Sequence, residues 1–407
     1  MRTALTVLGA AVLLTACAPA ADQSPPASPA ESTAAGPTRG PAPSVATPLI
    51  GEAVAEPVPV PATDGKTHLA YEIRLTNVLA QEVTLTSVTV LDRDVAMLNL
   101  AGDQLTPWMR ILGNTAPTTT IGPGQSAAIW LDVAIDKDAP APTRLTHAIS
   151  LSNSAPQPPL FPATQTIDVA PVTVQSRKPV VIDPPLRGPG WVDADGCCDT
   201  SAHRTALNPI NGQLWAAERF AIDYVQLDPA GRFLTGDPAE LESFAYFGAD
   251  IHAVADGQVV SVRDGLAEQV PGTNPSGLPL DQYPGNHVVQ SLGDGNYALY
   301  AHIRTGTVKV KPGDRLTAGQ VIGNVGNTGN SGAPHLHFHV MSSADPLRSD
   351  GLPFVFDDFR LEARIADIDD LDSLFNGNPV PRQRGFPARD ESAVMPLELD
   401  VMTYADR

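Results

Sequence analysis

Histidine alternates with apolar residues in the run Gly332–Val340, and this constrains the fold more than any other part of the sequence. A β-strand places residues i and i+2 on one face, so His335, His337 and His339 point the same way while the apolar residues between them face a core. Neutral imidazole is a common zinc ligand and the usual proton donor or acceptor near neutral pH. The run therefore predicts a functional strand, with the exposed polar face of a half-buried strand as the plainer alternative.

The rest of the chain also favours strands over long helices. Aromatic residues make up 5% of the 407 residues, and the chain holds 33 glycines and 40 prolines, a composition typical of short strands and many turns. In residues 49–178, apolar and polar residues alternate, for example around Tyr71 and Ile73. We predict an all-β chain whose residues 49–178 form an immunoglobulin-like sandwich. His68 and His147 are isolated in this region and are expected at its surface.

The net charge excludes one large class of partner. The formal charge is −19, and no cluster of lysine and arginine is visible along the chain. Binding to phosphate backbones needs such clusters. We therefore expect no nucleic-acid partner, and nothing in the sequence indicates a particular protein partner.

The first residues have the features of an export signal. Arg2 supplies a positive charge, residues 4–14 form an apolar run too short to span a bilayer, and the sequence LTAC follows, ending at Cys17. This ending resembles a bacterial lipobox, which implies cleavage before Cys17 and a lipid anchor on that cysteine. Residues 1–17 would then be a lipoprotein signal peptide. The alternative is an ordinary secretory signal that happens to contain a cysteine.

A proline- and alanine-rich segment, residues 18–48, follows the predicted anchor. It cannot bury enough apolar surface to offset the entropy lost on ordering, so we expect an extended, disordered tether. Ala18, rather than an acidic residue, comes directly after Cys17. The lipobox resemblance then implies a lipid-anchored protein of the cell envelope, in the outer membrane and facing the periplasm if the host is Gram-negative.

Four segments in the second half of the chain form an ordered set of motifs: Ala253–Val260, Tyr300–His302, Gly313–Gly323 and Gly326–Phe338. In this order they resemble the catalytic domain of the LytM/lysostaphin-type zinc endopeptidases, the M23 metallopeptidase family, which cut peptide bridges in bacterial cell walls. With the strand around Asp223, the resemblance covers roughly residues 200–345.

The resemblance implies a fold, a cofactor and a substrate. It implies a LytM-type antiparallel β-sheet domain, which we expect over residues 200–375. From their composition, we expect a proline- and glycine-rich linker before it at 179–199 and a polar C-terminal extension after it at 376–407. The resemblance implies that Asp223 and His337 bind Zn²⁺, that His302 and His335 handle protons, and that peptidoglycan peptides are the substrate. Zinc would activate water for attack on a peptide carbonyl. Which peptide bond is cut does not follow from the sequence.

One position departs from the family pattern. The family places a metal-binding histidine four residues before the metal-binding aspartate, but this chain has Arg219 four residues before Asp223. A guanidinium stays protonated and cannot bind a cation. The site is therefore one protein ligand short of the three that catalytic zinc sites use.

His203 is the candidate for the missing ligand. Asn211-Gly212 predicts a hairpin turn in which Ile210 pairs with Gln213, and counting outward along the hairpin brings His203 opposite Phe220. A shift of one residue, favoured by a proline inside the hairpin, would place His203 on the face of Asp223. The alternative is a solvent-exposed hairpin histidine.

The adjacent pair Cys197-Cys198 has three interpretations. Two packed thiols, a vicinal disulfide formed in an oxidising compartment, and a metal thiolate all remain open. His339 either supports a ligand histidine or is exposed, and His252 and His287 are expected at the surface.

Three further segments are expected to be loops. The stretches Gln226–Phe247 and Leu266–Pro284 interrupt strand-like runs and are predicted to shape a groove. The polar, proline-rich region Asn376–Ala393 is expected to be loosely ordered.

Two further functional hypotheses compete with a peptidoglycan endopeptidase. The first is a catalytically inactive LytM-like module that binds the wall and activates another wall hydrolase. The second takes the glycine-rich stretch Val308–Gly323 as a biotinyl- or lipoyl-like carrier fold. That fold would require a lysine at a tight turn between matched strands, which the stretch lacks, and it would leave the histidines unexplained.

Overall fold

The structure is a computed structural model that describes residues 44–367 and 376–406. The predicted signal peptide, Cys17 and most of the predicted tether lie outside these residues. The chain divides into a unit at Met1–Val45 and a unit at Ala46–Arg407, and everything below concerns the second unit. Within the described residues, no helix has the length and hydrophobicity needed to cross a membrane.

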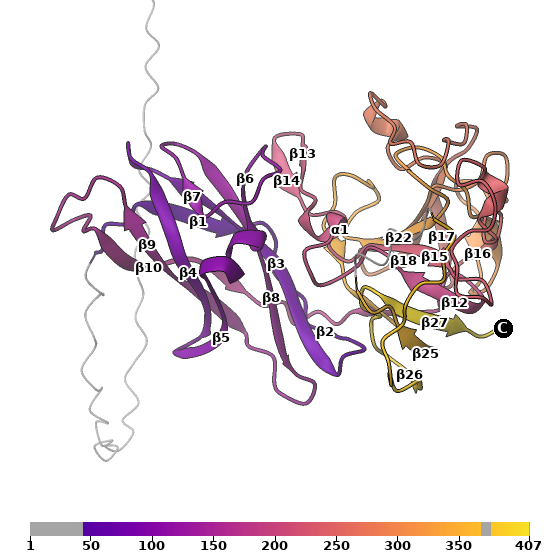
Figure 1. The fold of residues 1–407 in the computed structure, drawn as a ribbon, viewed down its shortest axis with the longest axis horizontal. Coiled ribbons are helices and arrows are strands. Elements are labelled where there is room, and N and C mark those ends of the chain that lie inside the picture. The colour runs from indigo at the N-terminus through magenta and orange to yellow at the C-terminus, as the bar shows by residue number, and fades with distance from the viewer. Residues whose placement is uncertain (1–43, 368–375, 407) are drawn as a thin grey trace, which may run out of the picture. The chain divides into compact units, whose positions relative to one another are not determined.

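The N-terminal half of this unit is built from two antiparallel sheets, drawn in indigo to purple in Figure 1. One sheet has the order β1-β3-β8-β6 with β2 beside β3, and the other has the order β10-β9-β4-β5 with β7 beside β4. The elements are β1 (Leu49–Ala53), β2 (Val60–Pro61), β3 (Lys66–Asn77), β4 (Val83–Asp92), β5 (Val95–Ala101), η1 (Gly102–Gln104), η2 (Thr106–Trp108), β6 (Met109–Ile111), β7 (Thr120–Ile121), β8 (Ser126–Asp136), β9 (Arg144–Asn153) and β10 (Thr164–Thr173).

Apolar side chains from both sheets form one buried core, which makes this region a β-sandwich. Tyr71 and Ile73 of β3 are fully buried in it, as the alternation in the sequence predicts. The immunoglobulin-like topology stays a prediction. The expected surface placement of two histidines is wrong: His147 is buried with Nε2 2.7 Å from the hydroxyl of Tyr71, and His68 is buried beside Asp132.

The second face of β3 is buried as well. Ala70 and Glu72 alternate with the core residues of the strand, and both are at most 1% exposed. Ala70 belongs to a separate apolar cluster with Cys197, Phe220 and Val355, which come from the C-terminal half of the chain. The alternation alone predicts a half-exposed strand. The C-terminal half covers the other face, a long-range contact that the local pattern does not encode.

The C-terminal half contains an eleven-stranded antiparallel sheet in the order β20-β17-β18-β19-β22-β15-β12-β27-β25-β26, with β23 beside β22. Three two-stranded pairs accompany it: β11-β24, β13-β14 and β16-β21. The elements are β11 (Val180–Ile182), β12 (Gly188–Asp193), α1 (Ala202–Thr205), β13 (Asn208–Ile210), β14 (Gln213–Trp215), β15 (Ile222–Gln226), η3 (Leu241–Ser243), β16 (Asp250–His252), β17 (Gly257–Arg263), η4 (Leu280–Gln282), β18 (His287–Gly293), β19 (Asn296–Ala301), β20 (Arg315–Leu316), β21 (Val321–Asn324), β22 (Leu336–Met341), β23 (Gly351–Leu352), β24 (Phe354–Phe356), β25 (Phe359–Arg364), β26 (Arg389–Glu391) and β27 (Asp400–Tyr404). The all-β prediction is confirmed.

Two segments expected outside the catalytic domain contribute strands to this sheet. Strand β12 lies within the predicted linker and pairs with β15, and β27 of the predicted C-terminal extension pairs with β12 and β25. The expectation of loose order at 376–393 is wrong in part, because residues 389–391 form β26. Strands this short carry little periodic signal, so their partners decide their structure.

The two predicted groove-shaping loops differ in what they do. The stretch Gln226–Phe247 sends Phe233 and Phe244 into the main core, so it is packed rather than open. The stretch Leu266–Pro284 ends in Tyr283 and Pro284, which line the cavity described next.

Candidate active site

Strand pairing brings the candidate residues of distant segments together. Strand β22 lies between β19 and β15, and its register places His337 opposite Asp223 of β15 and opposite Ala301 of β19. His302 follows Ala301 directly, at the end of β19. Its φ of 60° lies in the left-handed region that few non-glycine residues adopt, a kind of backbone strain that clusters at functional sites. His335 immediately precedes β22.

Asp223 is the centre of the cluster. Its Oδ1 lies 2.9 Å from Nδ1 of His337, 3.3 Å from Nε2 of His335 and 3.5 Å from Nε2 of His203. The ligand atoms of His203, Asp223 and His337 lie within 4.8 Å of one another, as do those of His302, His335 and His337. The structure therefore brings together all five candidate residues predicted for catalysis and metal binding.

Backbone carbonyls fix the orientation of three of these histidines. Nδ1 of His203 lies 2.9 Å from the carbonyl of Asp195, that of His302 lies 2.7 Å from Thr328, and that of His335 lies 2.8 Å from Ala333. A carbonyl only accepts, so each Nδ1–H donates and each Nε2 is left to face the cluster. Such partners fix the ring and tautomer of metal-binding histidines in known sites.

The sequence around this cluster matches a known family. Residues 241–349 match the model of peptidase family M23. This M23 segment contains His302, His335 and His337, whereas Asp223 and His203 precede it.

Curated relatives match over part of their length. The chain is 33% identical over 171 residues to the glycyl-glycine endopeptidase ALE-1 of Staphylococcus capitis, covering 41% of either protein. It is 29% identical over 102 residues to the peptidoglycan DD-endopeptidase ShyA of Vibrio cholerae, covering 25% of this chain and 20% of ShyA. Among solved structures, the catalytic domain of lysostaphin from Staphylococcus simulans matches with 22% identity and a TM-score of 0.22, over 41% of this chain and 88% of that domain. The chain thus spans less than half the length of these two curated relatives.

His203 lies beside the M23 segment, but a different local structure from the predicted hairpin places it there. The hairpin β13-β14 has the predicted pairing of Ile210 with Gln213, but it ends at Asn208. His203 instead lies on the single-turn helix α1, which Ser201 caps. The extension of the hairpin to His203 is therefore wrong, because the chain leaves the ladder and turns into α1. The helix directs the ring to Asp223.

Arg219 does not reach the cluster. It lies in the turn before β15, and its guanidinium binds the buried carboxylate of Glu72 from the sandwich. Burial alone would raise the pKa of Glu72, but the charges of Arg219 and Arg204 hold it below its usual value. The residue at the position where the resemblance expects the first ligand therefore forms an ion pair with the sandwich, outside the cluster.

His339 supports a neighbouring histidine. Its Nδ1 lies 2.8 Å from Nε2 of His337, and its side chain is 1% exposed, so the exposed alternative is wrong. Burial and the nearby charge of His337 lower the pKa of His339 well below its usual value. Its Nε2 has no hydrogen-bond partner among the described residues. His339 is therefore a neutral group that contacts His337 from the same face of β22.

Electrostatics concentrates positive charge around Asp223. Burial by itself would raise the pKa of Asp223, but the charges of His203 and His335 hold it well below its usual value. Burial lowers the pKa of His203, yet the carboxylates of Asp223 and Asp195 raise it overall to about 10. Burial and the charges of His335 and His337 lower the pKa of His302 well below its usual value. The carboxylate thus stabilises cations beside it, while His302 is neutral.

The cluster opens into a cavity of about 290 Å³. Tyr283 and Leu347 are among the residues that line it, together with the site histidines. His252 and His287 do not line it; each is half-buried, with Nδ1 close to a backbone carbonyl, so the surface expectation holds only in part. The cavity is a pocket of mixed polar and apolar lining beside the candidate ligands, large enough for part of a peptide.

Three residues of the site escaped prediction from the sequence. The carbonyls of Asp195 and Thr328 orient His203 and His302, and Glu72 binds Arg219. Thr328 lies in the Gly326–Phe338 motif, which was the available signal for it. Asp195 acts through its backbone carbonyl, which any residue type carries, and Glu72 acts through a contact between residues far apart in the sequence, so neither has a local signal.

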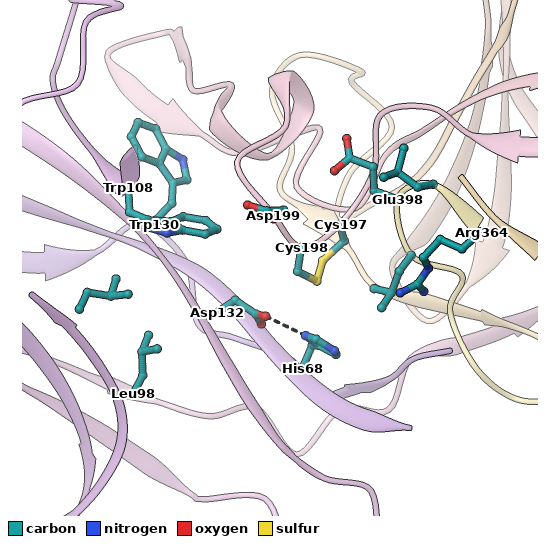
Figure 2. Close-up of a pocket in the computed structure, with 13 residues that line it drawn as sticks. His68, Leu98, Trp108, Trp130, Asp132, Cys197, Cys198, Asp199, Arg364 and Glu398 are labelled. Carbon is teal, nitrogen blue, oxygen red and sulfur yellow. Dashed lines mark hydrogen bonds and ion pairs between the residues drawn. A yellow bond between two sulfur atoms is a disulfide. The ribbon is translucent and has the colours of Figure 1, made fainter. Parts of the chain in front are cut away.

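A second cavity of about 430 Å³ lies beside the vicinal cysteines (Figure 2). Cys197 and Cys198 form a disulfide, so the packed-thiol and metal-thiolate interpretations are wrong for this structure. His68, Asp132 and Cys198 come close enough to suggest a metal site. However, both ring nitrogens of His68 face carboxylates. The sulfur of Cys198 is bound in the disulfide and is not a free thiolate, and Asp132 and Asp64 occupy both nitrogens of His68. We therefore assign no metal to this cavity.

Proposed function

We propose that this chain is a zinc-dependent endopeptidase that hydrolyses peptide bonds in the crosslinks or stems of peptidoglycan. The observation that carries the proposal is the convergence of His203 and His337 on Asp223, next to the oriented pair His302 and His335. The M23 match and the relatives named as peptidoglycan and glycyl-glycine endopeptidases support the substrate class.

The donor set fits a zinc ion. His203, Asp223 and His337 offer two imidazole nitrogens and one carboxylate oxygen, the number and kind of protein ligands found in catalytic zinc sites. Nε2 of His337 lies 2.8 Å from Nδ1 of His339, and its Nδ1, now 2.9 Å from Oδ1 of Asp223, is the nitrogen that would bind zinc in place of that hydrogen bond. His203 presents Nε2, because the carbonyl of Asp195 holds its Nδ1–H. In this proposal His203 replaces the ligand that Arg219 cannot supply.

The chain's own residues would handle the protons of hydrolysis. A bound zinc ion supplies a Lewis acid that makes water more acidic and polarises a peptide carbonyl. His302, held through Nδ1 by Thr328, presents Nε2 to accept a proton from the attacking water. His335, held through Nδ1 by Ala333, presents its Nε2–H to the developing oxyanion or to the departing amine.

Zinc content and wall digestion of the full-length protein test the proposal together. We expect about one zinc per chain after purification in zinc-supplemented buffer, release of peptide fragments from purified sacculi, and loss of both on treatment with a chelator. Bound zinc without any hydrolysis would contradict the enzyme and favour the regulatory module that activates another hydrolase. Absence of bound zinc would overturn the metal site.

We also propose that the protein is a lipoprotein of the cell envelope, anchored through Cys17, and facing the periplasm from the outer membrane if the host is Gram-negative. The lipobox-like ending at Cys17 supports this. Replacing Cys17 with serine is expected to move most of the protein from the membrane fraction to the soluble envelope fraction, because a lipid chain provides the anchor. Fractionation followed by immunoblotting measures the change. An unchanged membrane fraction in the serine variant would contradict the anchor.

A further inference from the structure

A buried carboxylate of the sandwich holds two arginines of the C-terminal half. Glu72 lies in the middle of β3, and its side chain is fully buried. Arg204 and Arg219, which both bind it, have side chains that are 0% and 4% exposed. Buried charges need partners of good geometry, and these groups have them.

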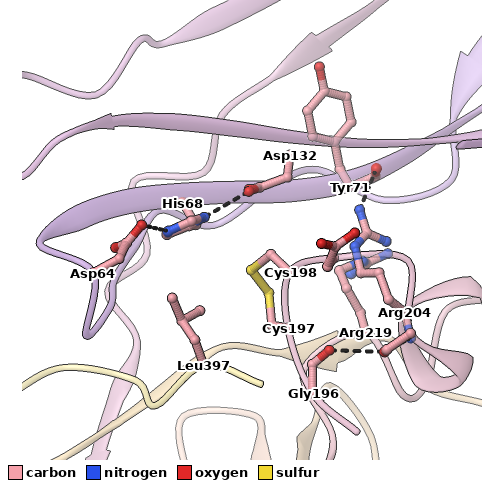
Figure 3. Close-up of a disulfide and its surroundings, with 12 residues drawn as sticks. Asp64, His68, Tyr71, Asp132, Gly196, Cys197, Cys198, Arg204, Arg219 and Leu397 are labelled. Carbon is pink, nitrogen blue, oxygen red and sulfur yellow. Dashed lines mark hydrogen bonds and ion pairs between the residues drawn. A yellow bond between two sulfur atoms is a disulfide. The ribbon is translucent and has the colours of Figure 1, made fainter. Parts of the chain in front are cut away.

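Arg204 is the more deeply anchored of the two. Its Nη1 pairs with Oε1 of Glu72, and its Nη2 donates to the carbonyl of Leu131 at 2.9 Å. The same Nη2 also donates to the carbonyl of Tyr71 at 3.0 Å (Figure 3). All three acceptors belong to β3 and β8 of the sandwich. One arginine therefore fixes the segment around residue 204 against two strands of another sheet.

Arg219, in the turn before β15, is the second arginine that binds Glu72. Its Nε lies 3.0 Å and 3.1 Å from the two carboxylate oxygens of Glu72, and its Nη2 lies 2.5 Å from Oε2. Its Nη1 donates to the carbonyl of Gly351 at 3.2 Å. Planar, forked contacts of this kind restrict both partners in orientation as well as in distance.

The two arginines have unequal consequences for the candidate ligands. Asp223 and His337 are held by the ladder between β15 and β22, which needs neither arginine. His203 has no ladder, because it lies on α1, a helix of four residues. A helix this short is not stable by itself in water, so contacts outside it must position it. Arg204, the next residue in the chain, supplies contacts to Glu72 and to two backbone carbonyls.

We propose that Glu72, acting through Arg204, is a positioning residue that places His203 at the metal site. The sandwich is then part of the catalytic apparatus and does not act merely as a spacer. This inference rests on the proposed zinc site. It gives the N-terminal sandwich a specific role: an anchor on β3 holds in place the ligand that substitutes for the one missing at position 219.

A matched pair of variants in the full-length protein tests the proposal. Arg204→Met and Arg219→Met each leave Glu72 with one arginine, so each keeps a neutral buried ion pair. Only Arg204→Met releases the anchor of α1. We expect zinc affinity, measured by competition with a chromophoric chelator, to fall at least tenfold in Arg204→Met and to change less than threefold in Arg219→Met. Losses of 10- to 100-fold are typical when a group that orients a metal ligand is removed.

Three additional variants complete the design. Glu72→Gln is expected to weaken zinc binding as Arg204→Met does, whereas Glu52→Gln, which breaks an exposed ion pair of the same sheet, should leave it unchanged. Circular dichroism and thermal melting identify any variant that fails to fold. His203→Ala sets the full effect of losing the ligand. If it loses zinc while folded Arg204→Met binds zinc within threefold of the parent, the positioning role is overturned and the zinc site stands.

An NMR measurement that does not require bound zinc distinguishes failure of this inference from failure of the proposed function. The Nδ1–H of His203, held by the Asp195 carbonyl, is expected to give a protected imidazole resonance in ¹⁵N-histidine spectra, assigned by its loss in His203→Ala. The resonance should disappear or shift in Arg204→Met and persist in Arg219→Met, whether or not the parent binds zinc. If the parent binds no zinc but the resonance behaves in this way, the zinc site fails and the anchor stands. A resonance unchanged in Arg204→Met contradicts the anchor.

Discussion

Replacing His337 with alanine is expected to remove bound zinc and wall hydrolysis together. His337 lies opposite Asp223 in the β15-β22 ladder, and its Nδ1 is 2.9 Å from the carboxylate, so the substitution deletes one of three candidate ligand atoms. We expect zinc affinity to fall by more than the 10- to 100-fold that loss of a supporting partner costs. Metal analysis after dialysis and turnover on purified sacculi measure the two effects.

His335→Ala provides the matched comparison, because the two histidines are two residues apart and face the same side of the strand. In the proposed mechanism His335 moves protons and does not hold the metal, so its variant should retain most of the zinc while turnover falls about 10²- to 10⁴-fold. Comparable zinc loss in both variants would show that the two roles are assigned incorrectly. His252→Ala, which alters a half-buried histidine outside the cavity, should leave both quantities unchanged.

The strand-borne part of the site could be predicted from the sequence because its determinants are local. The alternation around His337 fixes which side chains share a face, and the run that contains Asp223 has the same period. The register between the two strands then places Asp223 beside His337. The resemblance added the order of the motifs and the roles that we propose for the histidines. For the strand-borne residues, the alternation of side chains along each strand and the family resemblance were sufficient to predict that they lie together.

The remaining part depends on contacts that the sequence does not encode locally. The pattern of β3 indicates one buried face, but the other face is covered as well, and this turns Glu72 from an expected surface residue into a buried ion-pair partner. The sequence predicts His203 as a ligand through a hairpin, but the hairpin ends at Asn208, before His203. The disulfide at Cys197 was one of three open alternatives, because adjacent cysteines look the same in sequence whether they are oxidised or not.

His203→Ala is the substitution that decides whether this chain has a complete metal site. Nε2 of His203 lies 3.5 Å from Oδ1 of Asp223, and the carbonyl of Asp195 holds the opposite side of the ring. Removing the imidazole leaves two protein ligands, one fewer than catalytic zinc sites use. We expect zinc affinity to fall at least a hundredfold and wall hydrolysis to become undetectable, with the fold retained.

Arg219→His tests the opposing interpretation, in which no residue replaces the histidine missing at position 219 and the native site has only two protein ligands. The side chain at position 219 is directed to Glu72 and to the carbonyl of Gly351, away from the cavity that the site residues line. A histidine there should therefore fail to raise zinc affinity, either in the parent or in the His203→Ala background. If Arg219→His raises the affinity sharply while His203→Ala binds zinc as tightly as the parent, His203 is not the ligand. The site then lacks a ligand that the family ordinarily supplies.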